Sequence, residues 1–190
     1  GSLLIAEGAV HADVVTGEGE FTLDCARVEL ERGPGTGAQG FRQLVADGEV
    51  RFQGLQDFDV AGECELFVLE NDRSGYLEAG PGARVLLRGR DPVSQKPYRL
   101  GAERVDFTLE QGRAARLTAR RPELRMLGLR SKSASFTAAA EQGVVLSGGV
   151  RVSGATRNQV PFTLDAERVV LVGRRGQAAP AAAGDEEEVL

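Results

Sequence analysis

Apolar and polar residues alternate along most of the chain. Phe21, Leu23 and Cys25, for example, are separated by the polar Thr22 and Asp24. A period of two residues is typical of β-strands that bury one face and expose the other. Helical spacing is not found with comparable regularity, and we predict that even the alanine-rich stretch 134–141 is a degenerate strand. The pattern therefore predicts an all-β protein.

The strand pattern recurs as a two-part repeat. One half, as in L-V-A-D-G-E-V, occupies residues 4–10, 44–50, 77–85, 117–124 and 145–150, and all of these copies except 117–124 contain Gly and end in Val. The other half opens on an aromatic residue, as in F-T-L-D-C-A-R-V-E-L-E, and occupies residues 21–31, 58–70, 98–110 and 162–172. A period of roughly 26 to 40 residues is typical of stacked arrays. Glycines such as Gly8, Gly48 and Gly149 fit a turn or bulge that redirects the strand.

One copy of the repeat cannot bury its own apolar side, whereas stacked copies form a continuous apolar lining. We therefore expect one elongated β-jellyroll domain over residues 1–172, with two facing antiparallel sheets. Its terminal strands would have unpaired edges, which invite pairing with another chain. Residues 173–190 end in D-E-E-E-V-L and are predicted to form a flexible acidic tail.

Charge and hydropathy narrow the possible partners. The chain carries 28 acidic and 23 basic residues, a formal net charge of −5. This balance argues against nucleic acid as a partner, because nucleic-acid binding needs a basic face. The sequence contains no run of about 18 apolar residues, so no segment is expected to span a membrane as a helix. We interpret Gly1 and Ser2 as a cloning remnant and expect that a native targeting segment has been removed.

Motifs for catalysis or metal binding are weak. His11, the one histidine, lies in a predicted strand, where a surface role is expected, and the scattered carboxylates fit solvated faces. The glycines of residues 35–40 match G-x-G-x-x-G, but strand alternation follows them where a dinucleotide fold needs a helix. Cys25 and Cys64 fit two small buried residues, with a disulfide as the alternative. We expect no enzymatic activity, no catalytic residue, no cofactor and no metal.

A basic cluster lies between residues 113 and 132, with Glu123 as its one acidic member. A solvated face is one interpretation. The other is contact with lipid phosphates or an acidic partner, because the guanidinium group matches phosphate geometry. The candidate headgroup contacts are Arg116, Arg120, Arg121 and Arg125.

The repeat resembles that of the OstA/LptA family of lipopolysaccharide-transport proteins. The resemblance extends over nearly the whole chain to about residue 172 and is interrupted by Pro122, the long loop 32–40 and the acidic tail. The matching segments are G-E-V-R-F at 48–52 with 58–70, 149–152 with 162–172, L-G-A-E-R-V at 100–105 and L-D-A-E-R-V at 164–169.

The resemblance implies a periplasmic, non-enzymatic scaffold with a β-jellyroll, or β-taco, whose interior holds acyl chains of lipopolysaccharide or a similar lipid. It also implies head-to-tail joining, with other Lpt-type proteins or with a second copy, through terminal strand edges. LptA-like, LptC-like and LptD-like roles remain open. The expected lining residues are Val10, Phe21, Leu23, Val50, Phe52, Phe58, Val60, Val85, Leu87, Leu100, Phe107, Val150, Val152, Phe162 and Leu164.

Two functions therefore compete. In the first, the apolar residues line a trough that opens to lipid, where each buried methylene contributes about 0.8 kcal/mol. In the second, the same residues fill a closed core, and the chain is a structural β-solenoid that forms filaments or displays loops.

Overall fold

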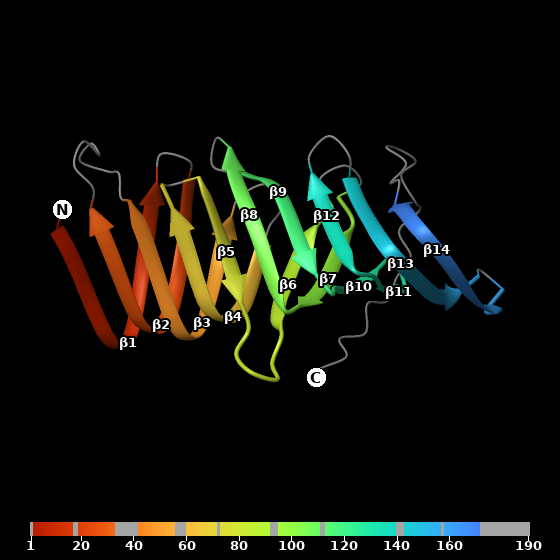
Figure 1. Cartoon of the computed structure of the whole chain (residues 1–190), viewed down its shortest axis with the longest axis horizontal. Coiled ribbons are helices and arrows are strands. Elements are labelled where there is room, and N and C mark those ends of the chain that lie inside the picture. The colour runs from red at the N-terminus through yellow and green to blue at the C-terminus, as the bar shows by residue number, and fades with distance from the viewer. Residues whose placement is uncertain are drawn as a thin grey trace, which may run out of the picture.

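A computed structural model describes residues 2–16, 19–32, 42–55, 60–71, 73–91, 95–110, 113–139, 143–156 and 158–171. These residues form fourteen β-strands, and all their pairings are antiparallel. The prediction of an elongated all-β jellyroll with two facing sheets is confirmed (Figure 1). Stretch 134–141 contains strand β12 (Ser135–Ala139), as predicted. Within the described residues, no helix is long and apolar enough to cross a membrane.

Six long strands run through both layers of the fold. Their pairing shifts register near the middle, for example between Glu7 and Val10 and between Asp47 and Val50. On one side of this bend a strand belongs to the layer that we call sheet I, and on the other side to sheet II. The six strands are β1 (Ser2–Thr16), β2 (Gly19–Arg32), β3 (Gln43–Leu55), β4 (Val60–Glu70), β13 (Gly143–Ala155) and β14 (Pro161–Leu171).

Eight shorter strands complete the two layers between β4 and β13. Sheet I continues through β5 (Ser74–Glu78), β8 (Arg104–Glu110), β9 (Arg113–Arg120) and β12. Sheet II continues through β6 (Val85–Arg90), β7 (Pro97–Ala102), β10 (Glu123–Met126) and β11 (Leu129–Lys132). Both layers meet again at β13, so the stack runs from β1 at one end to β14 at the other (Figure 1).

Glycines of the repeat sit where a long strand bends from one sheet into the other. Gly48 has a φ of +79°, and a Cβ there would lie 2.7 Å from the Cβ of Ala26 on the next strand. Gly148 repeats the arrangement with a φ of +78° and the Cβ of Ala134. A side chain would be strained at this φ and would also collide with the neighbouring alanine. The recurring glycine of the sequence pattern is therefore explained by the bend.

The core lies between the sheets and follows the predicted alternation. In β6 the inward Val85 and Leu87 are buried, while Leu86 and Arg88 are exposed. Phe67 of sheet I lies at the centre, with its ring 5.6 Å from that of Phe21 and 5.5 Å from that of Phe52.

Both cysteines are buried in this core and free, which confirms the interpretation as small buried residues. Cys25 is on β2 and Cys64 on β4, and β3 lies between them. Burial raises the pKa of the Cys64 thiol to about 12, so this group stays protonated and unreactive near neutral pH.

His11 joins the first strand to the second through an exposed ion pair. Its Nδ1 lies 2.7 Å from Oδ1 of Asp24, the residue directly opposite on β2. The hydrogen bond to Asp24 raises the pKa of His11 above its usual 6.5. The protonated form is thus favoured by folding, so this contribution is complete below pH 6.5 and is lost as pH rises through the raised pKa.

We expect His11→Gln to lower the melting temperature at about pH 5.5 and to leave it nearly unchanged at about pH 8. Thermal unfolding followed by circular dichroism at both pH values measures the difference between variant and wild type. Because both side chains are exposed, high salt should shrink the effect. An equal effect at the two pH values would contradict a role for the charged pair.

Candidate functional site

The predicted lining residues mostly face the space between the sheets. Those that are buried are Phe21, Leu23, Val50, Phe52, Val60, Val85, Leu87, Leu100, Phe107, Val150 and Val152, and Val10 is half-buried. Phe162 and Leu164 have the same inward orientation on β14, opposite Gly154 and Val152, but are 37% and 48% exposed because no strand covers them. Phe58 lies outside the described residues, as do the glycine-rich segment 35–40 and the predicted tail 173–190.

Side chains from the two sheets meet inside the stack. The ring of Phe67 on sheet I contacts those of Phe21 and Phe52 on sheet II, and Tyr98 on sheet II lies 6.0 Å from Phe136 on sheet I. The described interior is thus filled by the protein's own apolar groups. An acyl chain could enter it only if the sheets moved apart and gave up some of these contacts.

The two sheets are joined along one long side, which we call the seam, because the chain passes there from one sheet into the other. Neighbouring segments also pair at the seam, with backbone hydrogen bonds from Arg121 N to Ala134 O and from Ala134 N to Gly148 O, both 3.0 Å. Along the opposite side, which we call the lips, the backbone bonds that we find among the described residues stay within one sheet, such as Asp91 N to Lys96 O. The lips can therefore separate with the loss of side-chain packing while the backbone pairing is kept.

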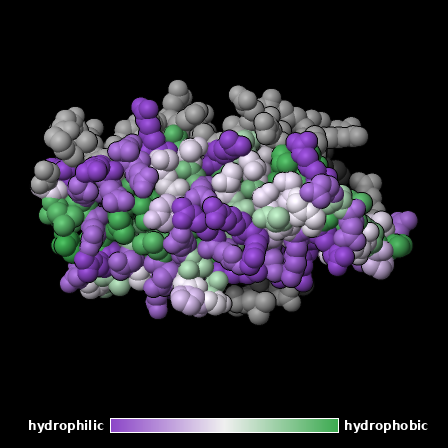
Figure 2. Space-filling model, in the orientation of Figure 1, coloured by the Kyte–Doolittle hydropathy of each residue, from purple (hydrophilic) through white to green (hydrophobic). Residues whose placement is uncertain are grey.

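Both ends of the stack expose apolar side chains. On β1, Leu3 and Leu4 are 60% and 58% exposed, and Figure 2 shows apolar side chains gathered at this end of the molecule. On β14, Leu164 and Val170 are exposed in the same way. In the described residues β1 pairs with β2 alone and β14 with β13 alone. The unpaired edges and the apolar side chains together are features of a surface that accepts a further strand.

The basic cluster predicted between residues 113 and 132 does not hold together in space. Arg116 and Arg120 lie on β9 and point outward from sheet I, whereas Arg125 lies on β10 and points outward from sheet II. Arg121 is at the seam, 3.3 Å from Glu103. These candidate headgroup contacts therefore do not share one surface, because the chain crosses from one sheet to the other between Arg120 and Glu123.

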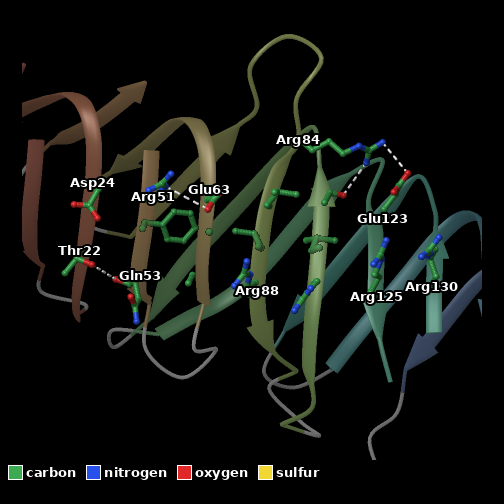
Figure 3. A pocket seen from close by; sticks show the side chains of 18 residues that line it. Thr22, Asp24, Arg51, Gln53, Glu63, Arg84, Arg88, Glu123, Arg125 and Arg130 are labelled. Atoms are coloured by element: carbon green, nitrogen blue, oxygen red, sulfur yellow. Dashed lines mark hydrogen bonds and ion pairs between the residues drawn. The ribbon is translucent and has the colours of Figure 1, made fainter. Parts of the chain in front are cut away.

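A different basic row lies on the outer face of sheet II, and we call it the arginine ladder. Arg88, Arg99, Arg125 and Arg130 stand directly opposite one another on β6, β7, β10 and β11. All four side chains are exposed, and they line a hollow of about 550 Å³. Figure 3 shows Arg88, Arg125 and Arg130 across this surface.

Charged residues beside the ladder are already paired. Glu123 lies 2.9 Å from Lys132 and 3.5 Å from Arg84, and the hydrogen bond from Lys132 lowers the pKa of Glu123. Arg151 is 2.7 Å from Asp165 on the same sheet. In contrast, the ladder arginines make no ion pair or hydrogen bond within the part of the chain that the structure describes.

The ladder was missed because its members come from two distant segments. Arg88 and Arg99 sit at outward positions of a hairpin, and this much was visible in the alternation around residues 85–90 and 97–102. The pairing of β7 with β10, which brings Arg99 opposite Arg125, is a tertiary contact. Sequence spacing alone therefore could not align the four side chains.

No protein-family model matches the chain, and no curated protein matches its sequence. In the described residues no group of three or more His, Cys, Asp and Glu side chains is placed to hold a metal ion.

Proposed function

We propose that this protein is a non-enzymatic scaffold of the periplasm that takes up acyl chains of lipopolysaccharide or a similar lipid between its two sheets. The observation that carries the proposal is the asymmetry between the seam and the lips. At the seam the long strands pass from one sheet into the other, and backbone pairing continues between neighbouring segments, whereas at the lips the backbone bonds that we find among the described residues stay within one sheet. A lipid tail that enters at the lips would replace apolar contacts by other apolar contacts.

The energetic balance favours exchange over simple opening. Separating the lips exposes apolar surface at a cost of about 25 cal/mol per Å². An acyl chain covers that surface again and buries its own methylenes, each worth about 0.8 kcal/mol.

The terminal strands support the second part of the proposal, which is that units join end to end. Exposed residues such as Leu4 and Leu164 would be covered by a second copy or by another β-jellyroll protein of the Lpt type.

Photo-crosslinking tests the proposal directly. A photoreactive amino acid is placed at the inward Leu146, at the half-exposed Phe162, and, as a control, at the exposed Thr108 on the outer face of sheet I. After irradiation with bacterial envelope membranes, we expect mass spectrometry to find lipid attached at the two inward positions and much less at Thr108. Equal capture at all three positions, or none at the inward ones, would contradict the proposal.

The filled interior favours a second function, in which the stack is a structural unit that binds no lipid. Under that alternative, chains still assemble through β1 and β14, so self-association in sedimentation experiments would persist while no inward position captures lipid.

A further inference from the structure

The arginine ladder is an arrangement that folding alone disfavours. Like charges directly opposite one another on neighbouring strands are destabilising. Strands are about 4.8 Å apart, so the Cα atoms of the four arginines span roughly 14 Å. The nearby carboxylates form their ion pairs with other residues, Glu123 with Lys132 and Asp165 with Arg151. Arg130 is the one ladder residue whose charge contributes to the lowered pKa of Glu123. A row of exposed, unpaired arginines with this spacing is suited to a ligand that carries more than one anionic group.

Phosphate is the anionic group that the row fits best. The guanidinium fork binds two oxygens of a phosphate at once and keeps its charge at any physiological pH. The hollow over the ladder opens on the outer face, and its volume of about 550 Å³ leaves room for a phosphorylated headgroup.

The ladder lies next to the lips. A second hollow, of about 600 Å³, is lined by the four ladder arginines and extends to Met126, Leu127 and Leu129 at the β10–β11 turn. Leu127 is 54% exposed at this turn. On the inward side, Leu129 and Phe162 both approach Gly154, where a Cβ would lie 2.6 Å from Leu129 Cδ2 and 3.4 Å from Phe162 Cε1. Basic and apolar groups thus adjoin one another across the lip of sheet II.

We propose that Arg88, Arg99, Arg125 and Arg130 bind the phosphate groups of an anionic lipid whose acyl chains lie at the adjacent lip. The position of the chains rests on the proposed function, whereas phosphate binding by the ladder does not. Such a ligand would span the lip, with its headgroup on the solvent-exposed outer face and its acyl chains passing the β10–β11 turn toward the interior.

Vesicle binding by the full chain tests the ladder. The probes are vesicles of phosphatidylcholine alone and of phosphatidylcholine mixed with phosphatidylglycerol. We expect binding to the mixed vesicles alone, and the double variant Arg99→Gln/Arg125→Gln should weaken it by about 30-fold, or roughly fivefold for each charge removed. The control Arg27→Gln/Arg151→Gln removes the same net charge from arginines that are ion-paired and lie outside both hollows. Equal weakening by both double variants would reduce the effect to net charge and overturn the proposal.

Thermal stability gives a readout that separates binding from structure. Removing two of four mutually repelling charges should leave the melting temperature of the ladder variant unchanged or raise it. A lower melting temperature together with lost binding would show that the arginines act through the fold, against the proposal.

Two further arms identify the ligand. If inorganic tripolyphosphate binds with the same dependence on Arg99 and Arg125 but vesicles do not, the ladder is a site for soluble phosphate and the lipid assignment is wrong. If the ladder variant keeps the vesicle affinity of the wild type and still captures lipid at Leu146, the ladder proposal is wrong and the proposed function is retained. Conversely, ladder-dependent vesicle binding without interior capture would refute acyl uptake and keep the phosphate site.

Discussion

Replacing Phe67 by alanine is expected to lower the free energy of unfolding by about 3 to 5 kcal/mol, the range for large aromatic side chains removed from a packed core. Phe67 is fully buried, and its ring contacts those of Phe21, Phe52 and Phe107 at 5.5 to 5.6 Å. Two of these neighbours belong to the opposite sheet. The substitution therefore leaves a cavity at the point where the sheets meet, in addition to removing the apolar area.

Urea unfolding followed by circular dichroism measures the change. The matched control is Phe162→Ala, because Phe162 is also an inward aromatic residue but is 37% exposed at the uncovered end of the stack. We expect that control to lose about 1 kcal/mol, in proportion to its smaller burial. Losses of similar size for the two variants would mean that the centre of the stack is no better packed than its end.

The second large effect is expected from Gly75→Ala. Gly75 lies on β5 between β4 and β8, and a Cβ there would overlap the carbonyl oxygen of Val68 and come within 2.6 Å of Phe107 Cζ. Because one of the colliding atoms is backbone, the strand itself must shift. We expect a loss of about 3 kcal/mol in unfolding free energy, at the upper end of the usual range for overpacking.

Gly101→Ala provides the comparison for this substitution. Gly101 is also a strand glycine, but a Cβ there would meet the Cδ of Arg84 at 3.6 Å, an ordinary van der Waals contact. Unfolding in urea should show Gly101→Ala to be neutral or slightly stabilising, since alanine restricts the unfolded chain. If both substitutions are neutral, Gly75 of β5 does not pack as closely against Val68 of β4 as these distances indicate.

Strand alternation was enough to predict the fold class and most of the core. Inward residues such as Leu23, Val50 and Leu100 are recognisable because burial on one face forces a period of two. The repeat also located Gly48, whose role at the bend follows from its φ and its contact with Ala26. These features are local, because they depend only on the spacing of a few neighbouring residues.

Features that depend on which strands become neighbours could not be predicted in the same way. The basic segment around Arg120 and Arg125 is continuous in sequence but divided between opposite faces, because the chain changes sheet within it. The ladder shows the converse, since Arg88 and Arg130 are far apart in sequence and stand on one surface. The sequence also could not distinguish a filled core from an open trough, because both require the same alternation of apolar and polar residues.

The bend at the seam has a consequence for how the protein holds together under stress. Because every long strand belongs to both layers, neither layer can form or come apart by itself, and the cooperative unit is a transverse slice of the stack. Slices at the two ends have a neighbour on one side and exposed apolar residues on the other. Unfolding is therefore expected to begin at β1 or β14 and advance slice by slice, and capping those strands would slow it for the whole molecule.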